Sequence, residues 1–356
     1  MGKRITMAMI ADACRTSIGT VDRALHNRAD INPETRRMIL ETAERLGYKT
    51  NQLAGALSRR STIRLACIDL NEPEDFFGYI HSGVQRAAEE LAPYGIEVDL
   101  LYYDAHTPDS QQQLLASLDC AQYDGIAINP QSVACAAYID RFSAAGIPTV
   151  TFNNDLPNSA RLFYVGVDSE QSGRMAGDIM GTLLNGRGAV TIMGNFNQAI
   201  PFVERFQGFC DVIHRHYPEI SVYPSADCKL DMTLTRRNLS NLFASVPDIR
   251  GIFCTNYVST VGAIRALREL GPKNVALIGY DISQAGIQAV KDGTCQCLLY
   301  QDPYQQGYQA IRLLAKHILE SWTPETDKIL LETRLAFRQN IENYSSGILR
   351  WDRSLL

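Results

Sequence analysis

Residues 6–25 read TMAMIADACRTSIGTVDRAL, and this stretch decides the fold of the amino-terminal part of the chain. Apolar side chains recur at helical spacing in its first half, and Thr6 stands where a helix N-cap accepts a backbone hydrogen bond. Ser17 is in position to cap a second helix, Ile18–Leu25, after a tight turn. Two short helices joined in this way are typical of a helix-turn-helix unit.

A third helix completes the expected unit. Asn32 is an N-cap candidate, Pro33 fits the first helical position, and Gly47 is a stop signal. Packed on the first two helices, this helix would close a small apolar core. The alternative is an ordinary three-helix capping domain whose charged face is only solvated.

The charge of the chain is unevenly distributed. The whole chain carries a formal charge of −5, but residues 1–62 contain eleven Lys and Arg against six Asp and Glu. This segment is therefore at +5, and the remaining residues are at −10. A basic head on an acidic body indicates that the head binds a polyanion and the body does not.

Candidate DNA contacts follow from the helix-turn-helix geometry, in which the second helix lies in the major groove. Its early residues are the candidate base readers, and these are Ile18, Gly19, Thr20, Asp22 and Arg23. Ile18 suits a thymine methyl group, and Arg23 suits guanine or phosphate. Groups around the turn and the following loop are expected to contact the DNA backbone. They are Thr6, Thr16, Ser17, His26 and Asn27.

From Ile63 onward, short apolar strands alternate with amphipathic helices, which is typical of parallel sheets covered by helices on both faces. The expected strands are Arg64–Leu70, Glu97–Tyr103, Gly125–Asn129, Thr149–Phe152, Ala189–Gly194, Gly251–Cys254, Val275–Gly279 and Gln296–Tyr300. Helices are expected near 78–92, 109–118, 133–144, 170–184, 199–216, 232–244, 257–270, 283–291 and 304–320. So many units indicate two Rossmann-like α/β lobes, with ligands at the carboxyl ends of the strands.

Polar and aromatic residues follow several of these strands. They are Phe76-Phe77, Asn153-Asn154-Asp155, Arg205 beyond the loop after the fifth strand, Thr255-Asn256-Tyr257, Tyr280-Asp281 and Gln301-Asp302. Aromatic faces with amide, carboxylate and guanidinium groups suit a small polyhydroxylated ligand. Each residue alone is also explained as a helix cap or turn residue, above all Asn154 and Asp302.

The head resembles that of the lactose-repressor/galactose-repressor (LacI/GalR) family of transcription regulators. The matching runs are Ile10–Ala13, Ser17–Leu25, Asn32–Arg37 and Ala43–Tyr48. The resemblance implies a hinge helix that folds when two copies meet over the minor groove, where Leu57 of each copy wedges between base pairs. Asn51 and Ala54 of this hinge are then further DNA contacts. The chain departs from the family pattern at Arg15, Gly19 and Gly55, which leaves the operator sequence open.

The body resembles the type I periplasmic sugar-binding fold, and ribose-binding proteins in particular. The matching runs are Asp168 with Gly173–Gly177, Glu204–Phe209, Ala263–Leu267, Ile278–Asp281 and Tyr300–Pro303. The resemblance implies a ligand site made of Phe76, Phe77, Asn153, Asn154, Arg205, Asn256, Asp281 and Gln301. Asn153-Asn154 stands where pentose binders often have an Asp-Arg pair, so we expect a neutral monosaccharide or polyol.

Together these features predict a repressor-like regulator in four parts. Residues 1–50 are the DNA-binding domain, 51–62 the hinge helix and linker, 63–340 the ligand-binding and dimerisation domain, and 341–356 a C-terminal tail. We expect a homodimer or higher oligomer on a palindromic operator, acting in the bacterial cytoplasm at the nucleoid. The effector alternative is a nucleobase or another non-sugar molecule.

Other classes of protein fit the sequence less well. A periplasmic binding protein would share the body, but the chain begins without a secretory signal and carries the basic head. An enzyme is disfavoured because no catalytic motif stands in a suitable context. We expect no membrane span, because no stretch of the sequence approaches about 18 consecutive apolar residues. We also expect no cofactor and no metal. The nine scattered cysteines look like free thiols and lack the spacing of metal ligands.

Overall fold

The computed structural model describes residues 6–25, 31–46, 62–72, 75–104, 107, 109–195, 200–223, 226–246, 248–271 and 274–344. The chain divides into two compact units, Met1–Arg60 and Ser61–Leu356. We call them the head and the body, and each is described by itself.

The head contains three helices, α1 (Met7–Ala13), α2 (Ile18–Leu25) and α3 (Pro33–Arg45). Each begins at the capping residue expected from the sequence, because Thr6, Ser17 and Asn32 each accept a backbone N–H at 2.8 to 3.4 Å. The helices share a small apolar core of Ile10, Ala11, Cys14, Val21, Ala24, Ile39 and Ala43. The expected hinge helix lies outside the described residues.

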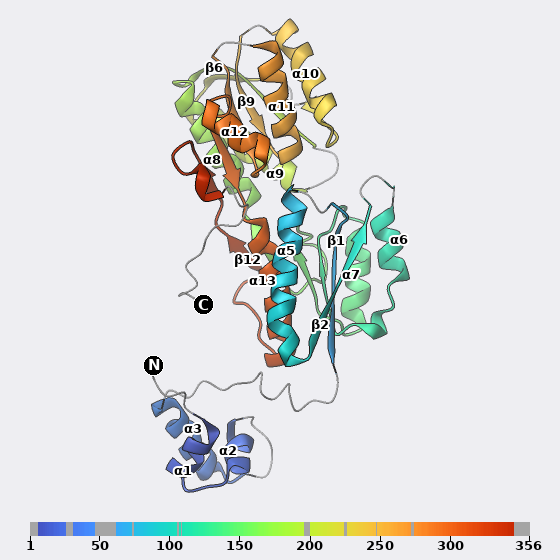
Figure 1. Cartoon of the computed structure of the whole chain (residues 1–356), viewed down its shortest axis with the longest axis vertical. Coiled ribbons are helices and arrows are strands. Elements are labelled where there is room, and N and C mark those ends of the chain that lie inside the picture. Colours follow the sequence, from blue (N-terminus) through green and yellow to red (C-terminus); the bar gives the residue numbers. More distant parts are fainter. Residues whose placement is uncertain are drawn as a thin grey trace. The chain divides into compact units, whose positions relative to one another are not determined.

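Lobe 1 of the body is a parallel sheet in the order β12-β5-β4-β3-β1-β2. The strands are β1 (Ile63–Leu70), β2 (Ile96–Tyr103), β3 (Gly125–Ile128), β4 (Thr149–Phe152), β5 (Tyr164–Val167) and β12 (Lys328–Leu331). One face packs on α5 (Asp75–Leu91) and α13 (Pro303–Glu320), which lie side by side (Figure 1). The other face packs on α6 (Ser110–Ser117) and α7 (Cys135–Ala144).

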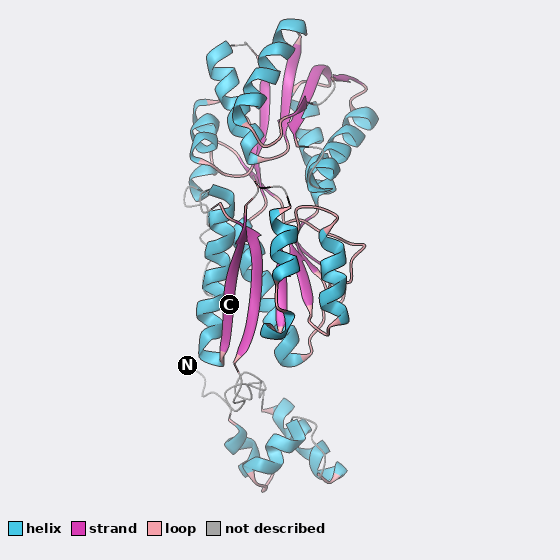
Figure 2. Cartoon of the chain, turned by 90° about the vertical axis from the view of Figure 1, so that its right-hand side faces the viewer, coloured by secondary structure: helices cyan, strands magenta, loops and turns pink. Residues whose placement is uncertain are grey.

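Lobe 2 is a sheet in the order β13-β11-β10-β9-β6-β7, with β8 beside β6. The strands are β6 (Arg187–Gly194), β7 (Glu219–Val222), β8 (Ala226–Asp227), β9 (Ile249–Cys254), β10 (Ala276–Tyr280), β11 (Cys297–Tyr300) and the antiparallel β13 (Arg334–Ala336). The helices are α8 (Ser169–Leu183) and α9 (Ile200–His216) on one face, and α10 (Met232–Ser245), α11 (Tyr257–Leu270) and α12 (Gln284–Asp292) on the other. Figure 2 shows the helices of the body flanking two separate sets of strands.

The chain crosses between the lobes three times. The crossings lie between β5 and α8, between β11 and α13, and between β12 and β13. Ile341 and Tyr344, at the start of the segment expected as a tail, are buried in the core of lobe 2.

The expected α/β architecture is confirmed. Each expected body helix and strand is present among the described residues, and its ends lie within three residues of the expected ones. Five strands were not predicted from the sequence, and these are β5, β7, β8, β12 and β13. These strands are short, with two to four residues each, and most lie at or near a sheet edge. Such segments show little periodicity of their own and form by pairing with a neighbour.

Candidate functional site

The head presents part of α2 to solvent. Ile18 is 53% exposed, and Ser17, Gly19 and Arg23 are exposed as well. Val21 faces the core instead, because it lies on the opposite side of the helix. The structure therefore leaves three of the expected base readers accessible on one face.

Arg23 folds back along α2 toward Gly19. A Cβ built on Gly19 would lie 3.8 Å from Nη2 of Arg23, so the guanidinium runs beside the bare backbone of Gly19. Thr6 is exposed, whereas Thr16, Thr20 and Asp22 are half-buried. The remaining expected contacts lie outside the described residues, and they are His26, Asn27, Asn51, Ala54 and Leu57.

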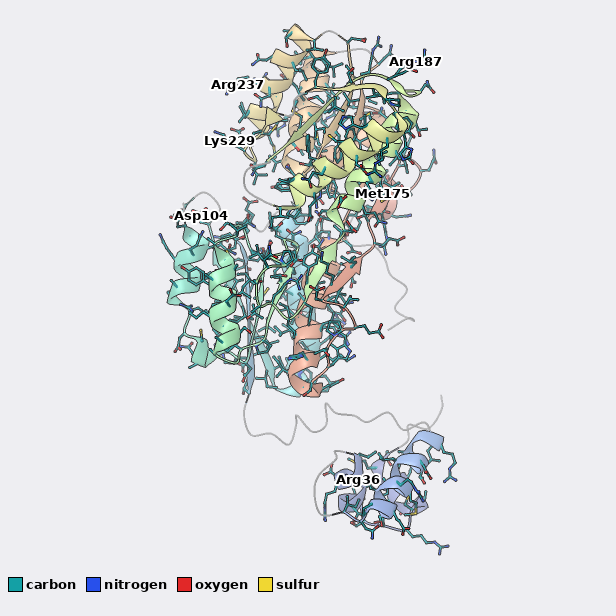
Figure 3. The ribbon with its side chains drawn as sticks, turned by 180° about the vertical axis from the view of Figure 1, so that it is seen from behind. Arg36, Asp104, Met175, Arg187, Lys229 and Arg237 are labelled. Atoms are coloured by element: carbon teal, nitrogen blue, oxygen red, sulfur yellow. The ribbon has the colours of Figure 1, made fainter. Side chains whose placement is uncertain are left out.

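Arg205 is a buried arginine in the second turn of α9. It is 2% exposed, whereas Arg187 and Arg237 of the same lobe project from its surface (Figure 3). Its Nη1 donates to the backbone oxygen of Thr255 at 2.7 Å, and its guanidinium lies 3.8 Å from the centre of the Tyr280 ring. These contacts offset the cost of burying the charge. Within the described structure its Nε has no hydrogen-bond partner, so a donor remains for a ligand.

Gln301 joins this arginine to a buried carboxyl group. Nη2 of Arg205 donates to Oε1 of Gln301 at 3.0 Å, and Nε2 of Gln301 donates to Oδ1 of Asp281 at 2.9 Å. Burial raises the pKa of Asp281 to about 6, although the Arg205 charge and the Gln301 hydrogen bond act to lower it. One cation and one acid balance each other here, so the arrangement suits a ligand without net charge.

Asn256 and Asp302 also act as helix caps. Oδ1 of Asn256 accepts the backbone N–H of Ser259 at 2.9 Å at the start of α11. Oδ1 of Asp302 accepts the backbone N–H of Gln305 at 3.2 Å at the start of α13. The structure thus explains both residues as capping groups, and it places Asn256 beside the Thr255 carbonyl that Arg205 uses.

Phe76 and Phe77 lie in the first turn of α5 in lobe 1. Their ring centres are 5.2 Å apart with the planes at 89°. Phe76 is 5% exposed and belongs to the core beneath α5, whereas Phe77 is half-buried. Phe77 is therefore the ring that is better placed to stack on a ligand.

Asn153 follows β4 in lobe 1 and has a left-handed backbone with φ of 60°. Its Nδ2 donates to Oε1 of Gln306 at 3.0 Å, and Nε2 of Gln306 donates to the backbone oxygen of Gln301 at 2.8 Å. Hydrogen bonds therefore connect four of the expected ligand residues through Gln306, a residue that was not predicted from the sequence. The neighbouring Asn154 is buried, and its backbone N–H donates to Phe152.

The lobes also touch elsewhere. The hydroxyl of Tyr257 in lobe 2 donates to Oε2 of Glu72 in lobe 1 at 3.4 Å. Ile200, at the start of α9, packs on the lobe 1 core beneath α6 and α7. The body is therefore held with its two lobes in contact.

A cavity of about 180 Å³ lies between β5, β12 and the first turns of α8 and α9. Its charged lining consists of Asp155, Asp168, Glu170, Glu204 and Lys328. Burial raises the pKa of Glu204, against the opposing charges of Lys328 and Arg205. Asp155, which follows Asn153 and Asn154, lines this cavity, but none of the eight residues of the ligand site implied by the resemblance does.

Two kinds of site are absent from the described residues. No group of three or more His, Cys, Asp or Glu side chains there could hold a metal ion. No helix among them is long and apolar enough to cross a bilayer.

Comparison with known proteins agrees with this architecture. The family described as periplasmic binding protein domain matches residues 70–320. The ribose import binding protein RbsB of Salmonella typhimurium is 25% identical over 258 residues, which cover 72% of this chain and 84% of that protein. The ribose operon repressor of Halalkalibacterium halodurans is 24% identical over 342 residues, which cover 94% of this chain and 96% of that protein.

A solved structure shows the same fold. The solute-binding protein of Burkholderia graminis, in complex with D-arabinose, superposes with a TM-score of 0.73 at 24% identity and covers 81% of this chain and 99% of that one. The body therefore has the type I periplasmic-binding-protein fold. The two relatives named above are an import binding protein for ribose and a repressor of a ribose operon.

Proposed function

The chain belongs to the periplasmic binding protein domain family, and on that premise we propose that it is a sequence-specific DNA-binding transcription regulator of the LacI/GalR type. Its operator binding is controlled by a small neutral sugar or polyol held between the two lobes. The response that we propose is repression that the ligand relieves, as in most sugar-responsive members of the family that the head resembles. Such a switch requires a ligand whose affinity differs between the two states of the protein.

The observation that carries this proposal is how much of the chain matches a repressor and how much matches a sugar import protein. A match over 94% of the chain, as with the ribose operon repressor, must include most of the head. The match to the ribose import protein covers 72%, a share that the body can supply alone. The basic charge of the head and the exposed face of α2 support a DNA-binding role for the part that the import proteins do not require.

The chemistry of the site supports the ligand class. Arg205, Asp281 and Gln301 offer charged and amide groups to hydroxyls, and Phe77 offers an aromatic face. Asn153 and Asn154 add amides without net charge. The ligand residues of the proposal are these six together with Phe76 and Asn256.

We infer a homodimer that reads a palindromic operator in the bacterial cytoplasm. Residues 1–50 bind the major groove, and residues 51–62 form the hinge with Leu57 at the minor groove. Residues 63–340 bind ligand and pair the copies, and residues 341–356 follow them. Closure of the lobes on ligand alters the spacing of the two hinges.

Two measurements on the full chain test the proposal. Selection from a random DNA pool should return a palindromic site, bound about a thousandfold tighter than unrelated DNA at fixed salt. A thermal-shift screen of monosaccharides, polyols and inositols should return a stabilising ligand that weakens operator binding. No preferred DNA site, or stabilisation by nucleobases alone, would contradict the proposal.

A further inference from the structure

Gln306 is a polar residue on the buried face of α13. Its exposed fraction is 0%, although glutamine is mostly found at protein surfaces. A buried amide is unfavourable unless both its oxygen and its nitrogen are hydrogen-bonded. The partners of this amide are therefore informative.

Those partners belong to opposite lobes. Nε2 of Gln306 donates to the backbone oxygen of Gln301 at 2.8 Å, where the chain leaves lobe 2. Oε1 of Gln306 accepts from Nδ2 of Asn153 at 3.0 Å, at the carboxyl end of β4 in lobe 1. The side chain of Gln301 in turn bridges Arg205 and Asp281. One amide thus links the two groups of residues expected to bind ligand.

The helix that carries Gln306, α13, packs directly against α5. A Cβ built on Gly307 would lie 2.4 Å from the backbone oxygen of Ile80, and one built on Gly83 would lie 2.0 Å from the backbone oxygen of Tyr304. The backbones of α5 and α13 are therefore in direct contact on both sides of Gln306, as Figure 1 shows for the paired helices. This contact fixes the amide relative to lobe 1.

We propose that Gln306 is a positioning residue for the ligand site of the proposed function. It holds the backbone of Gln301, so that the Gln301 amide points at Arg205 and Asp281. It couples this orientation to Asn153, so that Gln301 and Asn153 are already positioned when the lobes close on ligand. Gln306 itself contacts no ligand. Pre-organisation of this kind raises affinity because less ordering remains to be done on binding.

Three variants separate this role from simple core packing. Gln306→Glu keeps the size and the acceptor for Asn153, but as a carboxylate it has no donor for the Gln301 carbonyl; once protonated, it regains an O–H donor. Gln306→Met removes both hydrogen bonds at similar volume. Gln305→Glu is the matched control, since it adds the same charge one residue away and keeps the acceptor that Gln309 uses at 3.2 Å.

The first measurement is calorimetric affinity for the sugar or polyol that stabilises the protein most in the screen, at pH 5 and pH 8. Relative to wild type at the same pH, Gln306→Glu should bind about tenfold more weakly at pH 8 and within about threefold at pH 5. Gln305→Glu should stay within about threefold at both. The ratio to wild type removes the titration of Asp281. An equal loss at both pH values, or no loss at pH 8, would overturn the proposal.

The second measurement needs no ligand. Hydrogen exchange of the full chain should become about tenfold faster in segments 151–154 and 299–306 of Gln306→Met, with no change in Gln305→Glu. Unchanged exchange in these segments would overturn the role of Gln306 whatever the protein binds. Exchange could become faster in Gln306→Met while the wild-type protein binds no sugar or polyol. That result would support the positioning role of Gln306 and contradict the proposed function.

Discussion

The two lobes offer different chemistry to the space between them. Lobe 2 presents Arg205 and Asp281, both almost fully buried and joined through Gln301 by hydrogen bonds. Lobe 1 presents the half-buried Phe77 and Asn153. Charge-assisted hydrogen bonds are strong and directional at low dielectric, whereas contact with an aromatic face tolerates rotation. From this difference we propose that lobe 2 orients the ligand of the proposed function and that lobe 1 closes over it.

The largest expected effect is on the pH dependence of the free energy of unfolding, and it comes from the buried carboxyl group of Asp281 in lobe 2. A carboxyl whose pKa is raised on folding favours the folded state when protonated. The contribution of Asp281 is therefore complete below about pH 3.8 and is lost as the pH rises through about 6. Asp281→Asn removes this dependence. Its free energy of unfolding relative to wild type should increase by about 3 kcal/mol between pH 3 and pH 8, measured by urea titration.

Asp292→Asn is the control for this titration. The pKa of Asp292 is lowered, despite an opposing effect of burial, by hydrogen bonds from Thr294 and Arg268 and by the Arg268 charge. Its contribution to stability is therefore gained, not lost, as the pH rises through its usual range. Asp292→Asn should change in the opposite direction from Asp281→Asn. The same direction in both variants would mean that the buried charge of lobe 2 is not what titrates.

The next effect concerns ligand orientation by lobe 2. Arg205→Ala removes the charged donors and leaves Gln301 and Asp281 without their cation, so ligand affinity should fall about 30- to 100-fold. Operator affinity without ligand should stay within about twofold of wild type, since the head is untouched. Arg215→Ala is the control, because it removes an exposed arginine from the same helix α9. A ligand affinity within about twofold of wild type would place the site elsewhere.

A smaller effect is expected from the aromatic face of lobe 1. Phe77→Ala should weaken ligand binding about tenfold through loss of apolar contact, as measured by calorimetry. Phe77→Leu keeps apolar volume without the ring face and should fall between wild type and the alanine variant. A loss larger than that of Arg205→Ala would reverse the division of roles between the lobes.

The smallest effect is expected from the neutral amide of lobe 1. Asn153→Gly removes the amide and keeps the φ of 60°, which glycine adopts freely. Ligand affinity should fall about fivefold, the value of one neutral hydrogen bond. Asn185→Gly makes the same change at another left-handed position, φ 51°, and should leave affinity unchanged. Equal losses in both would assign the effect to backbone entropy rather than to the amide.

Much of the fold could be predicted because it is local. The caps at Thr6, Ser17 and Asn32 and the helical spacing behind them depend on residues a few positions apart. The long strands and helices of the body carry enough periodicity to be recognised in the same way. β12 and β13 are too short to show a recognisable periodicity. Only two residues separate these strands, yet they join different sheets.

In the candidate site, too, some residues could be predicted from the local sequence and others could not. Arg205, Asp281 and Gln301 were expected near one another because each follows a strand. Gln306 gave no comparable signal, since it stands inside an amphipathic helix and differs from its neighbours only as a polar residue on the buried face. Its importance depends on Asn153 and Gln301, which the sequence places far apart and only the packing brings within hydrogen-bonding distance.

The sequence by itself determined a basic three-helix head, an α/β body and the residue types of the site that we propose for a hydroxyl-rich ligand. These follow from local periodicity, caps and charge, which act over a few residues. The tertiary structure alone decided that Phe76 is buried in the core while Phe77 is more accessible, and that Gln306 joins the lobes. These outcomes depend on which distant side chains compete for the same buried space and the same hydrogen bonds.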